Sequence, residues 1–90
     1  MKIYVLNYFR SNTDTFSYQT TSSYNESVAA YTNASTAIDK LKEKAQQHID
    51  SLADVRDLVM TDKVTSIIID YKIPCYRVQV EYYIQELELA

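Results

Sequence analysis

The sequence predicts an α+β domain of order ββαββ, in which a four-stranded, mainly antiparallel sheet has one long helix packed on one face. Two observations lead to this fold. Apolar and polar residues alternate from Lys63 to Gln85 on both sides of a single proline, and an apolar stripe with helical spacing precedes that stretch. The chain has 90 residues, which is enough for one domain, 1–90, with one thin core.

The alternating stretch predicts a β-hairpin that folds about Pro74 and Cys75. In this register the apolar cross-strand pairs are Ile73 with Tyr76, Tyr71 with Val78, Ile69 with Val80 and Ile67 with Tyr82. Pro74 cannot adopt the positive φ that a two-residue primed turn needs, so we expect a four-residue loop around a type I turn.

A second hairpin is predicted near the N-terminus. Lys2 to Phe9 is apolar at almost every position, as in a central strand that is covered on both faces. Residues 11–14 have turn chemistry, and residues 15–20 are expected to form the next strand with both aromatic side chains inward. Residues 21–32 are polar without a period, which favours a loop, although the last few can extend the pairing.

The apolar stripe predicts one long helix. The stripe consists of Ala34, Ala37, Ile38, Leu41, Ala45, His48, Ile49 and Leu52, and Val55 and Val59 fall on the same line. Four residues near its start have side chains that suit the N-cap, namely Thr32, Asn33, Ser35 and Thr36. No proline or glycine interrupts the pattern before Pro74, so we expect the helix to reach about Met60, with a break near Leu52 as the alternative.

One helix covers only one face of such a sheet. The uncovered face is predicted to present Tyr4, Leu6 and Tyr8 from the first strand, Val64 and Ile68 from the third and Tyr83 from the fourth. An apolar patch of this kind usually marks a partner surface, and tyrosine, which occurs nine times, suits such contacts. Strand propensity explains the tyrosine count equally well. We expect a protein partner here: a homodimer that packs sheet to sheet is the simplest explanation, and a foreign protein is the alternative.

The outer face of the predicted helix is a second candidate surface. Five carboxylates project there if the helix is continuous, namely Asp39, Glu43, Asp50, Asp54 and Asp57. We name this set the acidic ridge. An ordinary solvated helix face explains it most simply, and a dock for a basic protein or a mimic of nucleic acid is the alternative. Its charges would lie about 5–7 Å apart along the helix, against about 1.7 Å along duplex DNA, which weakens the mimic.

Composition excludes several classes of function. The net charge of −3 and pI near 4.9 disfavour direct nucleic-acid binding, which needs a basic face. Glycine is absent, so loops that cradle phosphates are excluded. No apolar run is long enough for a signal peptide or a membrane span, so we expect a cytoplasmic protein without membrane contact.

No residue pattern indicates a catalytic, metal or cofactor site, and we expect no enzyme. His48 lies on the apolar stripe, where a core histidine is the simpler interpretation, and Cys75 lies in the predicted turn. Asp70 and Glu81 are diagonal neighbours in the hairpin register and not a committed acid–base pair.

The sequence therefore favours a non-catalytic module that acts by protein–protein contact. Its small, acidic and motif-free composition resembles that of stand-alone inhibitors from phages or mobile elements, such as anti-CRISPR proteins. One alternative is a small-ligand-binding or enzymatic domain with a site at a dimer cleft that uses His48, Cys75 or the Asp70 region. The other alternative is an acidic nucleic-acid mimic.

Overall fold

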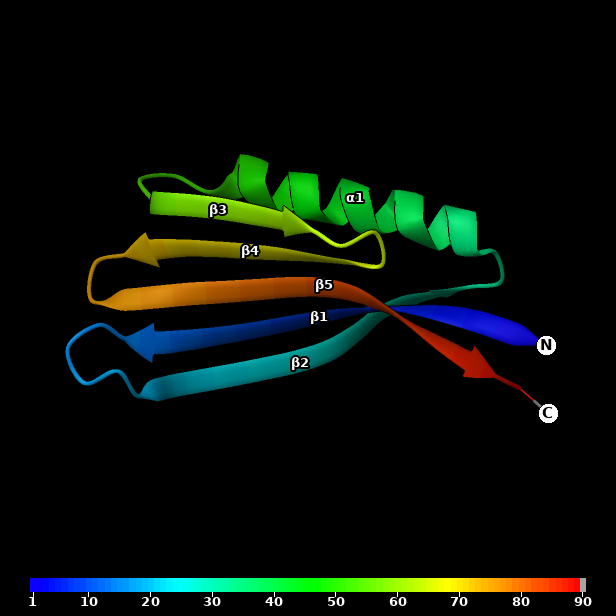
Figure 1. Ribbon diagram of the computed structural model, residues 1–90, viewed down its shortest axis with the longest axis horizontal. Coiled ribbons are helices and arrows are strands. Elements are labelled where there is room, and N and C mark those ends of the chain that lie inside the picture. The colour runs from blue at the N-terminus through cyan, green and yellow to red at the C-terminus, as the bar shows by residue number, and fades with distance from the viewer. Residues whose placement is uncertain (90) are drawn as a thin grey trace.

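A computed structural model describes residues 1–89 as five strands and one helix (Figure 1). The elements are β1 Lys2–Asp14, β2 Thr20–Tyr31, α1 Ala34–Ser51, β3 Arg56–Asp62, β4 Ser66–Ile73 and β5 Tyr76–Glu88. The strands form one antiparallel sheet in the order β2-β1-β5-β4-β3, so the first and last strands of the chain are neighbours in its centre. The α+β class, the antiparallel sheet and the single helix are confirmed. The four-strand ββαββ order is wrong, because a further strand, β3, follows the helix.

The β4–β5 hairpin has the predicted register. Ile73 pairs with Tyr76, Tyr71 with Val78, Ile69 with Val80 and Ile67 with Tyr82. The turn differs from the expected type I, since Cys75 at its third position has φ 73°, whereas type I keeps φ negative there. Positive φ after a proline is the pattern of a type II turn, so Cys75 takes a position that usually belongs to glycine.

The N-terminal hairpin is longer than predicted. β1 continues through the expected turn to Asp14, and the turn lies at residues 15–19. Asp14 Oδ1 accepts hydrogen bonds from the backbone N–H groups of Phe16 (2.8 Å) and Ser17 (3.1 Å), an Asx-type arrangement that stops the strand there. The aromatic side chains predicted to point inward, Phe16 and Tyr18, are 83% and 84% exposed.

Residues 20–31 form the edge strand β2 and not the predicted loop. Their side chains are mostly exposed on both faces, so no apolar period marks the strand. β2 forms because the N–H and C=O groups along one side of β1 need partners, and β2 supplies them over nearly its whole length.

The helix ends earlier than predicted. Asn33, one of the four N-cap candidates, accepts a hydrogen bond from the N–H of Thr36 (3.2 Å). At the other end Leu52 has extended backbone (ψ 137°) and Asp54 has φ 57°, so the chain leaves the helix after Ser51 instead of near Met60. The chain then turns back, and the segment that matched the helical stripe pairs with β4 instead.

The core lies between α1 and one face of the sheet. The helix contributes Ala37, Leu41 and Ala45, and the sheet contributes Leu6, Ile67, Ile69, Tyr71, Val78, Val80 and Tyr82. All of these side chains are buried. This arrangement is typical of a helix that packs through a narrow apolar stripe.

The prediction that Tyr4, Leu6 and Tyr8 line the uncovered face is wrong. They pair with Glu86, Ile84 and Tyr82 of β5, on the side that faces α1. Leu6 is fully buried, and Tyr8 packs against the core. β1 is apolar on both faces, so only its register with β5 decides which set of side chains meets the helix.

Val64 also does not belong to the uncovered face. It lies in the connection between β3 and β4 with φ 70°, and its side chain is exposed.

The strands are much longer than the helix. Thirteen residues at about 3.3 Å each span about 43 Å, which agrees with a molecule that is 47 Å long, 24 Å wide and 18 Å deep. The 18 residues of α1 span only about 27 Å at 1.5 Å per residue. The helix therefore covers only part of the length of the sheet. Figure 1 shows the β1–β2 and β4–β5 turns at one end of the sheet and both termini at the other.

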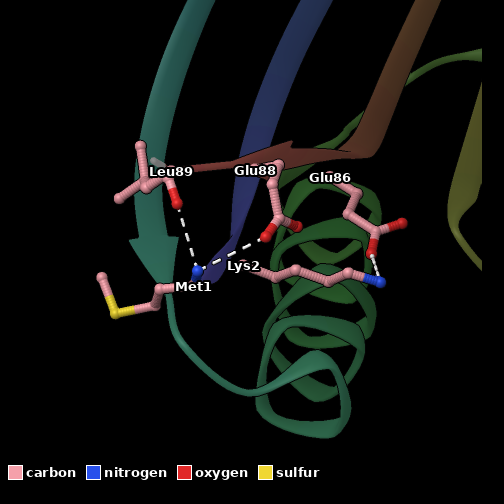
Figure 2. A network of polar contacts seen from close by, with 5 residues as sticks. All are labelled: Met1, Lys2, Glu86, Glu88 and Leu89. Atoms are coloured by element: carbon pink, nitrogen blue, oxygen red, sulfur yellow. Dashed lines mark hydrogen bonds and ion pairs between the residues drawn. The ribbon is translucent and has the colours of Figure 1, made fainter.

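The ends of β1 and β5 meet in a set of exposed polar contacts (Figure 2). The N-terminal ammonium group of Met1 lies 3.4 Å from Glu88 Oε1 and donates to the carbonyl of Leu89, whose N–H donates to the carbonyl of Met1. Lys2 Nζ lies 3.1 Å from Glu86 Oε1, and this hydrogen bond raises the pKa of Lys2. Exposed pairs of this kind add little stability, so the backbone pairing holds these ends. No helix in residues 1–89 has the length and apolar character needed to cross a membrane.

The position of Leu6 gives a first prediction. Leu6→Ala should lower the free energy of unfolding by about 2–5 kcal/mol, because it opens a cavity beneath α1. Val5→Ala, one residue away on the other face, should cost roughly 1 kcal/mol or less because Val5 is only half-buried. Urea denaturation followed by circular dichroism measures both values. Equal losses would contradict this assignment of the two faces.

Candidate protein-binding surface

The sheet face opposite α1 has no cover from residues 1–89, and we name it the open face. Its apolar side chains come from β1, β4 and β5 and are Ile3, Val5, Phe9, Ile68, Tyr83 and Leu87. We name these six residues the open-face patch. Ile68 and Tyr83 were predicted on this face, and the strand registers place them there. Ile3, Val5 and Phe9 alternate with Tyr4, Leu6 and Tyr8 along β1, so they lie on the open face because the other set meets the helix.

Tyr83 lies across the middle of the patch. It sits on β5 opposite Asn7 of β1, and its hydroxyl reaches Asn25 Oδ1 of β2 at 3.4 Å, so the ring spans the intervening strand. Asn7 is buried, and Ser27 Oγ donates a 2.9 Å hydrogen bond to its Oδ1. The polar group within this face therefore has a partner, and a flat tyrosine ring forms part of the outer surface.

A carboxylate lies within the patch. Glu81 of β5 is opposite Phe9 on one side and Ile68 on the other. It is half-buried, and the described residues provide no ion pair for it. A protein that covers the open face therefore has to supply a donor to this carboxylate, since an unpaired buried charge is costly.

The other half of the open face, near the turns, is polar. A shallow hollow of about 500 Å³ lies there and is lined by Ser11, Thr13, Asp14, Thr15, Tyr18, Asp70, Lys72, Arg77 and Gln79. Arg77 binds both carboxylate oxygens of Asp70, at 2.9 and 2.8 Å, and Lys72 lies 3.5 Å from Asp57. Both cations are thus balanced, so the hollow is a poor site for an anion.

These pairs explain how the sheet tolerates Lys72 opposite Arg77, which the register predicted. The diagonal relation predicted for Asp70 and Glu81 is also confirmed, since Asp70 pairs with Gln79 and Glu81 with Ile68. Each of the two cations turns to an acidic neighbour, so the like charges do not face each other without compensation.

The edge strand β3 carries a further apolar surface. Leu58, Val59 and Met60 are 43%, 57% and 50% exposed, although they are consecutive large apolar residues. The prediction missed this surface because the spacing of Val55 and Val59 continued the helical stripe. A short apolar run between charged residues was the signal for a strand.

The acidic ridge is not a continuous surface. Only Asp39, Glu43 and Asp50 lie on α1, and Lys40, Lys42 and Lys44 lie on the same helix. Asp54 belongs to the loop after the helix, and Asp57 lies in β3 beside Lys72. Three carboxylates among three lysines are typical of a solvated helix face, so the basis for a nucleic-acid mimic is lost.

His48 lies in a cluster of tyrosines between α1 and the sheet. Its ring centre is 6.5 Å from that of Tyr8, 6.3 Å from Tyr71 and 6.0 Å from Tyr82. Its Nδ1 lies 3.4 Å from the Tyr82 hydroxyl, while Nε2 is buried and without a hydrogen-bond partner among the described residues. Burial, with a smaller contribution from the charge of Arg10, lowers the pKa of His48.

Among the described residues, the one polar contact of the His48 ring is the contact with Tyr82. Cys75 is exposed in the β4–β5 turn, where its backbone carbonyl accepts a hydrogen bond from the N–H of Thr15. It is not a hydrogen-bond partner of His48. Within residues 1–89, no group of three or more His, Cys, Asp or Glu side chains lies close enough together to hold a metal ion.

The chain was also compared with protein-family models, curated proteins and solved structures. No match was found.

The environment of His48 predicts a pH dependence of stability. Because its pKa is lower in the folded chain than the unfolded value near 6.5, the unfolded chain binds the extra proton first. Stability should therefore decline as the pH falls through about 6.5 toward the lower folded pKa, and His48→Phe should remove this part of the decline. Urea denaturation at pH 7.5 and 5.5 measures it for both proteins. The same loss in the variant would contradict this assignment, since the chain has only one histidine.

Proposed function

We propose that the protein is a non-catalytic binding module whose open-face patch docks another protein. The observation that supports this is the uneven cover of the sheet: one helix buries one face, and the opposite face presents a half-buried apolar patch with Phe9 and Tyr83 at its centre. Apolar surfaces that a chain leaves uncovered are typical of contact sites, and aromatic residues are enriched at their centres.

The polar residues around the patch fit the same function. Gln79 and Gln85 of β5 and Asn25 of β2 lie beside the patch in the strand registers. An apolar centre with a polar rim is the usual composition of a protein–protein interface. This arrangement supports a partner that is itself a folded protein.

Glu81 defines the chemistry of the partner more closely. A carboxylate between Phe9 and Ile68 favours a partner that brings a lysine or arginine into an otherwise apolar contact. The net charge of −3 also favours a basic partner through long-range attraction. We therefore propose a foreign protein whose contact surface is apolar with a basic group near its centre.

A role as an inhibitor is one form of this function. A small module without a catalytic site acts on a target by covering it, and the smallness and acidity of the chain support this form. An inhibitor of this kind would capture an enzyme, and that enzyme would lose activity in proportion to the amount of this protein bound to it.

The function is tested by capture on the immobilised protein. We expect at least one protein from a host extract to be retained by the wild type and lost by Phe9→Ser/Ile68→Ser, as measured by quantitative mass spectrometry. The matched control is Gln46→Ser/Gln47→Ser on the exposed face of α1, which leaves the net charge unchanged and should retain it. Binding to the purified partner should weaken at least ten-fold in the double variant, and Glu81→Gln should weaken it and reduce its salt dependence.

Two outcomes would contradict the proposal. Capture that survives the open-face double variant but is lost in the helix variant would place the contact on α1. The second outcome is that no captured protein depends on Phe9 and Ile68, although circular dichroism shows that both variants are folded. This outcome would mean that the open face is not a docking surface.

A further inference from the structure

The two edges of the sheet differ in chemistry. β2 carries mainly Ser, Thr, Asn and Glu, so its side chains are largely polar. β3 instead exposes Leu58, Val59 and Met60, and all seven of its residues are exposed. A free strand edge with consecutive apolar side chains is a template for pairing with another strand.

The backbone of β3 is available for such pairing. The N–H of Lys63 donates to the carbonyl of Ser66 of β4 at 2.8 Å. In an antiparallel pair the inward-bonding residues alternate, so the N–H and C=O groups of Asp62 and Met60 point away from β4. Because β3 is the last strand of the sheet, these groups face the free edge.

The sequence of β3 is complementary to itself when two copies run antiparallel. With Val59 opposite Val59 of a second copy, Leu58 faces Met60 in both directions, so the centre of the contact is apolar. The charged residues of β3 add no ion pair to this contact, because the pairings with β4 place Arg56 on the open face and Asp62 on the face that carries α1. Centring the pair on Met60 instead would place Leu58 against Asp62.

A bulge interrupts β3 at one end of this contact. The pairing with β4 shifts by one residue between Arg56 and Val59, and Asp57 has φ 53°. Residues 57 and 58 together face one residue of β4, so Leu58 belongs to the bulge, whereas Val59 and Met60 lie in the regular part of the strand.

We propose that two copies of this chain pair antiparallel through β3, with Val59 on the two-fold axis, and form one continuous ten-stranded sheet. The proposal does not depend on the binding function of the open face. A two-fold axis perpendicular to the sheet places both helices on one side and both open faces on the other.

The oligomeric state tests the proposal first. Sedimentation equilibrium over a range of concentrations should show a species of twice the 10.4 kDa chain mass. Val59→Lys should halve this mass, because it places two ammonium groups opposite each other. Val28→Lys on the β2 edge is the matched control and should remain dimeric. Phe9→Ser/Ile68→Ser should also remain dimeric, so failure of the open-face function and failure of this dimer are distinguishable.

Cysteine cross-linking then tests the register. In a Cys75→Ser background, Val59→Cys should form an intermolecular disulfide under mild oxidation, because a central pair without backbone hydrogen bonds brings the Cα atoms to about 4.5 Å. Thr61→Cys is the control and should not link to itself, since four residues of offset separate the two cysteines by roughly 13 Å.

A mass of 10.4 kDa at every concentration would overturn the dimer. A dimer that persists in Val59→Lys, or that is lost in the folded Val28→Lys or open-face variant, would place the interface on another surface. Cross-linking at Met60→Cys in preference to Val59→Cys would overturn the register centred on Val59.

Discussion

The contact between the apolar stripe of α1 and the inner face of the sheet is the interaction on which the rest of the structure depends. Leu41 sits at the centre of this stripe between Ala37 and Ala45, and the small alanines let the helix approach the strands closely. The same contact fixes the orientation of β1 and of the β4–β5 hairpin, because Leu6, Ile69 and Val80 must all lie beneath the helix. Residues 1–89 provide no second helix for the opposite face, so that face and the β3 edge meet solvent or another molecule.

The absence of glycine shapes most of the turns of this chain. Tyr18, Asp54, Asp57, Val64 and Cys75 all have positive φ, and each lies in a turn, a loop or the β3 bulge. Left-handed backbone costs a non-glycine residue about 1–2 kcal/mol, so these positions persist only where neighbouring contacts hold them. Asp14 and Asp62 show how this is done, since each side chain accepts backbone N–H groups of the adjoining turn. The core between helix and sheet therefore has to offset the strain in the connections.

The sequence was informative wherever one face of an element is buried and the other is not. The β4–β5 hairpin meets this condition, and its register could be predicted pair by pair. β1 is apolar on both faces, so no pattern within it separates Leu6 from Val5. β2 is polar on both faces and forms to satisfy the backbone of β1, which is a long-range effect. β3 was mistaken for helix because Val55 and Val59 are four residues apart, a spacing that fits both structures when the run is short.

The two proposed surfaces have a geometric relation that follows from the order of the strands. β3 and the centre of the open-face patch lie in the same sheet, separated by β4. Pairing through β3 would therefore set two open faces side by side on one continuous surface, with Ile68 of each copy close to the shared edge. If a partner offers two equivalent apolar sites, its first contact with the dimer holds its second site close to the second open face. The second contact then forms within the complex, at a high effective concentration of that site. A monomeric partner would gain nothing from the pairing, so the ratio of its affinities for wild type and Val59→Lys distinguishes the two kinds of partner.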